Sequence, residues 1–163
     1  MRNHAQIQLS LRLAACAFAA AVAMTAQAQA APVSQTAPIG NFSGVDEIVY
    51  NCTNGTTFTN MPSMNRAFTL GASDQVVVMF QASAGLSGQP FDTGFVRLTI
   101  DGTAQGPADG LIPLIGVDER GTHGFTWQSK TLSKGSHTAR IQWRTDLGSS
   151  FCVDARSLIV LHR

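Results

Sequence analysis

The sequence predicts an all-β protein: a jelly-roll-like antiparallel β-sandwich of about 8–10 short strands, preceded by a cleaved signal peptide. Apolar and polar residues alternate over short runs, which is the period of a strand with one buried face. No window keeps a helical period for three turns. Pairs such as Asn54-Gly55 and Asp101-Gly102 separate the runs at intervals of about 8–14 residues, as turns do in sandwiches and barrels.

Residues 1–30 have the pattern of a secretory signal peptide. Arg2 and Arg12 lie in a polar, positive region, residues 13–24 are apolar and uncharged, and a small-x-small cleavage pattern ends at Ala30. The apolar run of about 12 residues is shorter than the roughly 20 that a membrane-spanning helix needs. We therefore expect export to the periplasm or beyond the cell, with no membrane span in the mature protein.

The remaining chain is close to neutral. Residues 31–44 are small, polar and proline-containing, which predicts a flexible lead-in, and residues 45–163 are long enough for a single domain. The whole chain has net charge +1, and loss of the two arginines in the leader leaves a net charge of −1. This balance argues against nucleic acid as a partner, because it supplies no basic surface.

Short runs between the turn signals are the predicted strands. In chain order they are Glu47–Cys52, Thr56–Thr59, Ala67–Leu70, Gln75–Ala82, Gly94–Asp101, Leu111–Ile115, Gly124–Thr131, His137–Thr145, Phe151–Asp154 and Ser157–Leu161. The last of these is apolar in four consecutive positions, as expected of a central strand covered on both sides. Trp127 is expected in the core from its position in an alternating run.

One predicted strand carries a row of polar residues on its outward face. Within His137–Thr145, the residues Arg140, Gln142 and Arg144 share that face. Two guanidinium groups about 13 Å apart along a strand fit carboxylates of a protein partner or an acidic glycan. The alternative is a solvated sheet face whose arginines pair with neighbouring Asp or Glu residues.

Cys52 and Cys152 remain after the leader is removed. An even pair in an exported chain predicts one disulfide, which would close a loop of 100 residues. In the chain-entropy view such a loop contributes about 4–5 kcal/mol to stability. Neither cysteine has a second Cys or a His at metal-ligand spacing, which disfavours a metal site or a reactive thiol.

The last part of the chain carries a family resemblance. Residues 135–145 (GSHTARIQWRT) and 153–161 (VDARSLIVL) resemble the closing hairpin of small secreted bacterial jelly-roll proteins, many of which have no assigned function. Those proteins are similar in shape to tumour-necrosis-factor-like and complement-type globular heads, which pack as trimers. The resemblance implies a homo-oligomer, with a trimer favoured. We expect Leu158 and Val160 of the apolar last strand to be buried in its interface.

Catalytic signatures are sparse. The chain has no Gly-x-Ser-x-Gly motif, and its domain-body histidines, His123 and His137, have no sequence context that marks a catalytic base. The adjacent acids at 46–47 and 118–119 point to opposite faces if they lie in strands, which does not suit a glycosidase pair. We therefore predict no catalytic residue and no cofactor.

Two groups of residues are considered as metal ligands. Met61, Met64 and Met79 offer thioethers to Cu(I), but methionines also fill gaps in cores. Asp101, Asp109 and Asp118 flank loops without the interleaved spacing of a calcium loop. We predict no metal.

These observations favour a secreted, non-enzymatic β-sandwich that acts by binding or self-assembly at or outside the cell envelope. The alternative is a carbohydrate-binding module in which exposed aromatic residues stack on sugars; the candidates are Tyr50, Phe91 and Phe95. A secreted hydrolase is the least favoured class.

Overall fold

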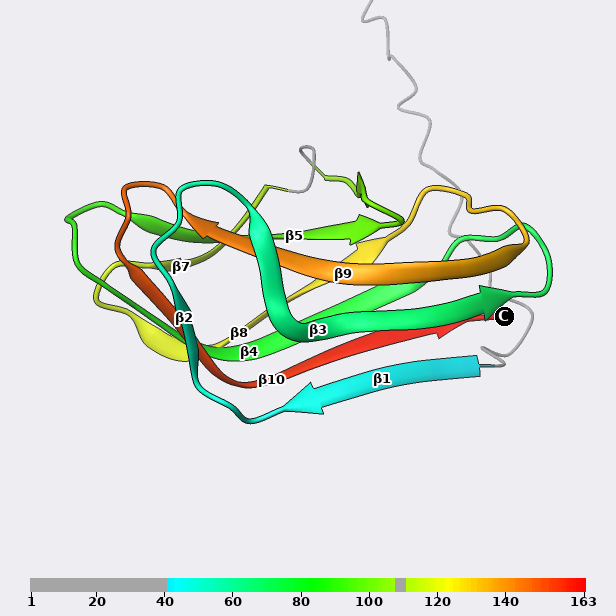
Figure 1. Ribbon diagram of the computed structural model, residues 1–163, viewed down its shortest axis with the longest axis horizontal. Coiled ribbons are helices and arrows are strands. Elements are labelled where there is room, and N and C mark those ends of the chain that lie inside the picture. Colours follow the sequence, from blue (N-terminus) through cyan, green and yellow to red (C-terminus); the bar gives the residue numbers. More distant parts are fainter. Residues whose placement is uncertain (1–40, 108–110) are drawn as a thin grey trace, which may run out of the picture. The chain divides into compact units, whose positions relative to one another are not determined.

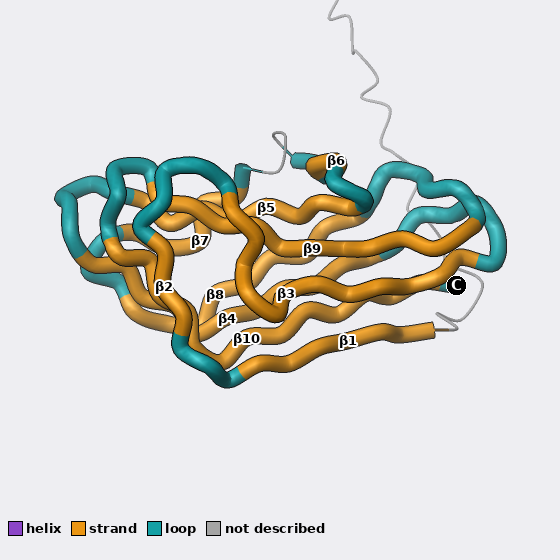
Figure 2. The backbone as a smooth tube through the Cα atoms, in the orientation of Figure 1, coloured by secondary structure: helices purple, strands orange, loops and turns teal. Residues whose placement is uncertain are grey.

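The computed structural model describes residues 41–107 and 111–163, which form ten strands and no helix (Figures 1 and 2). The all-β prediction is confirmed. No helix capable of crossing a membrane occurs within these residues. The predicted signal peptide and residues 31–40 of the predicted lead-in lie outside the described part of the chain.

The strands form two antiparallel sheets that lie one above the other in Figure 1. Sheet A has the order β1 (Asn41–Glu47), β10 (Ser150–His162), β4 (Val77–Ser87) and β8 (Arg120–Gln128), with β2 (Asn51–Thr53) also paired to β10. Sheet B has the order β3 (Thr59–Leu70), β9 (Gly135–Thr145), β5 (Thr93–Ile100) and β6 (Thr103–Ala104), with β7 (Ile112–Gly116) also paired to β5. The arrangement is a β-sandwich.

The inward faces of both sheets supply the core. Alternation along β5 and β9 places every second side chain inside, as predicted, and Trp127 is 1% exposed. The largest fully buried side chains include Trp127, Phe80 and Phe151. Burial of this apolar surface is the main stabilising contribution to the fold.

The predicted oligomer contact through Leu158 and Val160 is wrong. Both side chains are 0% exposed because they point into the core of their own chain, where Leu158 pairs with Phe80 of β4. The strand is central, as predicted, since β1 and β4 flank it. Its apolar inward residues are therefore satisfied within the sandwich.

Several strand boundaries differ from the prediction. The two final predicted strands are one strand, β10, interrupted by a register shift between Val153 and Arg156 that works as a β-bulge. The predicted strand Thr56–Thr59 is wrong except for its last residue, because β3 begins at Thr59 and runs on through the predicted strand Ala67–Leu70. Strand β1 begins at Asn41, inside the predicted lead-in, because its residues pair with the end of β10.

The positions of the three methionines also argue against a common copper site. Met61 and Met64 are 2% and 0% exposed and belong to the core cluster. Met79 lies on the outward face of β4, opposite the buried Val78 and Phe80. The three thioethers therefore do not face a common site.

Candidate binding surfaces

The outer face of sheet A is built from small residues along its middle. Ser83 and Gly85 of β4 point outward and pair with Thr122 and Arg120 of β8, while Gln81 pairs with Gly124. Directly opposed residues of an antiparallel pair lie on the same face, so these side chains share the outer surface. Small side chains leave the sheet floor open between larger residues at its rims.

Four hollows lie in a row over this floor and share lining residues. They follow one another along β4, from Ser87 back toward Met79. The first and second hollows share Tyr50, Gly85 and Arg120; the second and third share Ser83; and the third and fourth share Gln81. We call these adjoining hollows along β4 the sheet A groove. Its polar and aromatic lining residues include Asp46, Glu47, Tyr50, Gln81, Ser83, Asp118, Glu119, Arg120, Thr122, Asp154 and Ser157.

Tyr50 forms an aromatic wall of the sheet A groove. The side chain is 59% exposed, and it follows two other exposed apolar residues, Ile48 and Val49, in the link between β1 and β2. Tyr50, Ile48 and Val49 together form an exposed apolar cluster beside the groove, and apolar clusters rimmed by polar residues are typical of interaction sites.

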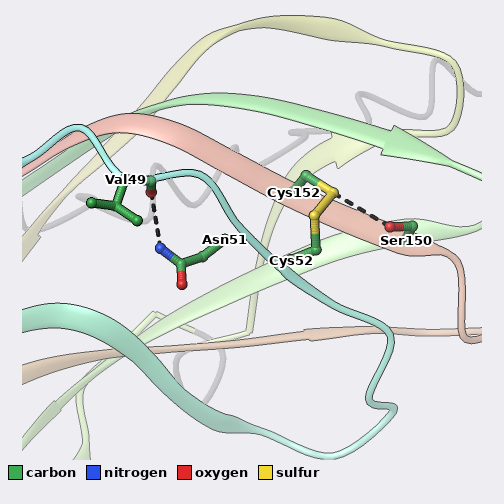
Figure 3. The surroundings of a disulfide bond; sticks show 5 residues. All are labelled: Val49, Asn51, Cys52, Ser150 and Cys152. Carbon is green, nitrogen blue, oxygen red and sulfur yellow. Dashed lines mark hydrogen bonds between the residues drawn. A yellow bond between two sulfur atoms is a disulfide. The ribbon is translucent and has the colours of Figure 1, made fainter.

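The backbone on both sides of Tyr50 is fixed. Two residues after it, Cys52 is joined by a disulfide to Cys152, its direct partner in the β2–β10 ladder (Figure 3). One residue before it, the Val49 carbonyl accepts hydrogen bonds from Asn51 Nδ2 at 2.9 Å and from Arg156 Nη1 at 2.6 Å. Tyr50 is therefore presented from an anchored segment.

Arg156 makes one of these anchors from inside the sandwich. It is 4% exposed, and besides Val49 it donates to the carbonyls of Asp154 (3.1 Å) and Pro62 (3.2 Å). Burial lowers the pKa of Arg156, but a guanidinium remains charged at any physiological pH. This residue ties the bulge of β10 to the β1–β2 link and to β3.

The sheet A groove is predominantly acidic. Its lining contains Asp46, Glu47, Asp118, Glu119 and Asp154, against which stand Arg120 and the buried Arg156. Hydrogen bonds from the Ser63 hydroxyl and from the backbone N–H groups of residues 48 and 49 lower the pKa of Glu47, so that it is charged at neutral pH. Carboxylates accept hydrogen bonds from hydroxyl groups and repel anions.

The outer face of sheet B is basic and aromatic. Arg140, Gln142 and Arg144 lie there, as the alternation of β9 predicts, and each is paired with a residue of β5: Thr99, Arg97 and Phe95 respectively. Two participants were not singled out as binding residues from the sequence. These are Arg97, and Phe58, which lies outside any regular strand. We call the surface formed by Phe58, Phe95, Arg97, Arg140, Gln142 and Arg144 the arginine face.

The three aromatic residues predicted to stack on sugars do not come together. Tyr50 borders the sheet A groove, Phe95 lies on the arginine face, and Phe91 lies in the turn between β4 and β5. Phe91 is 94% exposed and has a positive φ of 64°. The sequence identified exposed aromatics but could not show which of them share a surface.

Comparisons with known proteins identify no family for this chain. No protein-family model matches the chain, and no curated protein sequence matches it. The chain is similar to the CBM36-1 domain of a multidomain xylanase from the hindgut metagenome of Trinervitermes trinervoides. The TM-score is 0.39 at 13% sequence identity, and the similarity covers 72% of this chain and 96% of that one. A likeness of this strength carries no inference about function.

His137 is not arranged as the base of a catalytic triad. His137 is 8% exposed; its Nδ1 lies 2.6 Å from Asp101 Oδ2 and its Nε2 lies 2.8 Å from the backbone carbonyl of Ser133. A triad requires that second nitrogen to face a nucleophilic hydroxyl. Here a carbonyl occupies the position, so the arrangement is a structural clamp.

Metal ligation finds no support among the described residues. They contain no group of three His, Cys, Asp or Glu side chains that could hold an ion. Of the three aspartates weighed for calcium, Asp101 is engaged by His137, Asp118 has a positive φ of 61° in a turn, and Asp109 lies outside the described part of the chain.

Proposed function

We propose that this protein is an exported, non-catalytic carbohydrate-binding protein that holds a polysaccharide chain along the sheet A groove. The observation that carries the proposal is the position of Tyr50, an exposed aromatic residue fixed at the wall of the sheet A groove, whose lining is rich in polar side chains. Sugar rings present an apolar face to an aromatic ring and hydroxyl groups to its polar neighbours.

The groove chemistry suits an uncharged glycan. Carboxylates such as Asp154 and Asp46 accept hydrogen bonds from sugar hydroxyls, and Gln81 and Arg120 supply donors. The excess of acidic groups disfavours anionic polymers at this site. Because the hollows adjoin one another along β4, a chain of several sugars fits better than a single one.

Export is supported by the disulfide as well as by the predicted leader. Disulfides persist in oxidising compartments and are rare in the reducing cytosol. Cys52 and Cys152 are joined in the fold, and this bond supports a working place outside the cytoplasm.

The experiment is affinity electrophoresis of the mature protein in gels containing a neutral polysaccharide: xylan, glucomannan or hydroxyethyl cellulose. We expect at least one to retard the protein. The Tyr50→Ala variant is expected to weaken that binding by about tenfold or more, which corresponds to about 1.4 kcal/mol, whereas Tyr50→Phe keeps the ring and most of the affinity.

Phe91→Ala is the matched control, because Phe91 is a more exposed aromatic residue that does not line the groove. Its retardation should equal that of the wild type. If no neutral polysaccharide retards the protein, or if Tyr50→Ala and Phe91→Ala behave alike, the proposal fails.

A further inference from the structure

The arginine face carries a second feature that the groove does not explain: a stack of cations on aromatic rings. The Arg97 guanidinium carbon lies 4.2 Å from the centroid of the Phe58 ring. That of Arg144 lies 4.7 Å from the Phe95 ring and 5.4 Å from the Phe58 ring. Guanidinium groups held against rings are already ordered, so that less entropy is lost when they bind a ligand.

An amide ladder crosses the same face. Arg97 Nε donates to Gln142 Oε1 at 2.7 Å, and Gln142 Nε2 donates to Asn60 Oδ1 at 2.9 Å. These contacts join strands β5, β9 and β3 and use one donor of Arg97. The terminal guanidinium nitrogens of Arg97 make no hydrogen bond to any described residue.

The positive charge on this face is mostly uncompensated. Among the described residues, Arg144 pairs with Asp146 at 2.9 Å, whereas no carboxylate lies within ion-pair distance of Arg97 or Arg140. Arg140 is exposed and lies four residues from Arg144 along β9, about 13 Å at the rise of a strand. The two unpaired guanidinium groups, those of Arg97 and Arg140, lie on the adjacent strands β5 and β9, and such groups on one face complement a polymer with repeated carboxylates.

We propose that the arginine face binds an acidic polysaccharide whose sugars carry carboxylates, as in polyuronates. Arg97 and Arg140 bind the carboxylates, and the Asn60–Gln142 amides offer hydrogen bonds to neighbouring hydroxyls. This site is separate from the sheet A groove, since it lies on the other sheet and has the opposite sign of charge. The proposal therefore goes beyond the function proposed above, and its test does not depend on the outcome for the sheet A groove.

The strand arrangement favours a glycan over an acidic peptide. Extended peptides commonly bind by adding a strand to a free sheet edge. Here β9 is already paired with β3 and β5, and β5 with β9, β6 and β7, so that the middle of the face offers no unpaired backbone. The groups available on it are side-chain guanidiniums, amides and ring edges.

The first test uses the wild-type protein with polygalacturonate, measured by biolayer interferometry at about 20 mM and about 150 mM salt. We expect binding at low salt, weakened at the higher salt, and lost when the polymer's carboxyls are converted to methyl esters. Binding that survives esterification, or absence of binding at low salt, would overturn the proposal. Equal affinity for polyglutamate would also overturn it, because charge alone would then suffice.

The second test locates the site. The double variant Arg97→Gln, Arg140→Gln is expected to bind polygalacturonate about tenfold or more weakly. The control is Lys130→Gln, Lys134→Gln, which removes the same number of positive charges at exposed residues outside both the arginine face and the sheet A groove and should bind as the wild type does. Circular dichroism checks that each variant is folded. Equal losses in both variants would show a general charge effect and overturn the assignment.

The same proteins separate this proposal from the groove. Tyr50→Ala should keep polygalacturonate binding while losing neutral polysaccharide, and the double arginine variant should do the reverse. If Tyr50→Ala abolished polygalacturonate binding instead, the acidic polymer would be bound in the groove and the arginine face would have no such role.

Discussion

His137 Nδ1 lies 2.6 Å from Asp101 Oδ2, and this pair fixes the turn after β5 to the start of β9. The other ring nitrogen faces the Ser133 carbonyl at 2.8 Å, so both nitrogens have acceptors. Only the doubly protonated ring donates to both. The hydrogen bonds that the ring donates to the Asp101 carboxylate and to the Ser133 carbonyl accordingly raise the pKa of His137 above its ordinary value of 6.5.

The His137–Asp101 pair predicts that the free energy of unfolding falls as the pH rises. A pKa raised in the folded state contributes stability that is complete below the unfolded value of 6.5 and is lost as the pH rises through the folded value. Burial raises the pKa of Asp101, but hydrogen bonds from His137 and the Thr138 N–H outweigh it and leave that pKa lowered. The carboxylate is therefore charged throughout the neutral range.

Urea unfolding at a series of pH values from about 5 to about 9 measures the effect. The free energy of unfolding of the wild type should fall as the pH rises above 6.5. His137→Gln should be less stable at pH 5, by about 1.5–3 kcal/mol for the lost charge-assisted bond, and its curve should be flatter. Parallel curves for the two proteins would contradict the assignment of the charge to His137.

Asp92 predicts a second pH dependence, at acid pH. The side chain is 1% exposed, and it accepts four backbone hydrogen bonds, from the N–H groups of Thr93 (2.7 Å), Asp146 (2.9 Å), Leu147 (2.9 Å) and Ser149 (2.8 Å). Burial acts to raise its pKa, but the hydrogen bonds lower it from 3.8 to about 2. By linkage this contributes about 2 kcal/mol at neutral pH, lost as the pH falls from about 4 toward 2.

The variant Asp92→Asn removes the charge at nearly constant size. We expect it to lower the free energy of unfolding at pH 7 by about 3 kcal/mol, because one acceptor oxygen becomes an NH2 group that faces a backbone N–H and the remaining hydrogen bonds lose the charge of their acceptor. Asp146→Asn is the matched control, since that carboxylate is exposed and pairs with Arg144 at the surface. Comparable losses of stability in both variants would contradict the stabilising role assigned to the buried hydrogen bonds of Asp92.

The sequence predicted those parts of the fold that alternate regularly. In β5 and β9 the inward and outward residues follow the period of two, so the positions of Trp143 inside and Arg144 outside could be read directly. In β3 the period fails, because Met61 and Met64 are both buried although they are three residues apart. Ser63 has a positive φ of 62° there, and the register with β9 shifts between Asn60 and Asn65.

The candidate surfaces were less predictable because they depend on which strands become neighbours. Arg140, Gln142 and Arg144 lie on one strand and could be grouped from the sequence. Phe58 joins them only because sheet B places its segment beside β9 and β5. The prediction that Leu158 lies in an oligomer interface was wrong for a related reason. An apolar strand indicates burial, but it does not show whether the covering surface belongs to another sheet or to another chain.

A trimer remains a prediction. Light scattering of the purified mature protein tests it directly, and about three times the monomer mass would support it. The surface involved must then lie outside the inward residues of β10, since Leu158 and Val160 are already buried in the core.

Gly124 predicts a local intolerance of side chains where β8 meets β4. A Cβ atom at this position would lie 2.6 Å from the Phe80 carbonyl oxygen and 2.9 Å from Gln81 Cγ, so the strand would have to move. Gly124→Ala should therefore lower the free energy of unfolding by about 1–3 kcal/mol. Gly71→Ala is the control, because nothing lies within 4 Å of its Cβ position. Its stability should be unchanged or raised by up to about 1 kcal/mol.

The disulfide is expected to affect both stability and binding, because it closes a long loop and anchors Tyr50. Cys52 and Cys152 are 100 residues apart in sequence, so in the chain-entropy view their bond contributes about 4–5 kcal/mol. β2 has three residues and reaches sheet A only through β10, so that reduction frees the backbone two residues from Tyr50. The remaining anchor is Arg156 at the Val49 carbonyl.

The paired substitution Cys52→Ser, Cys152→Ser tests this at constant size. Urea unfolding should show the loss of stability, and affinity electrophoresis under conditions where the variant is still folded should show weaker retention by neutral polysaccharide. Polygalacturonate binding should be unchanged, because the arginine face lies on sheet B. A variant that loses stability but keeps full affinity for the neutral glycan would mean that Arg156 alone suffices to hold Tyr50 in place.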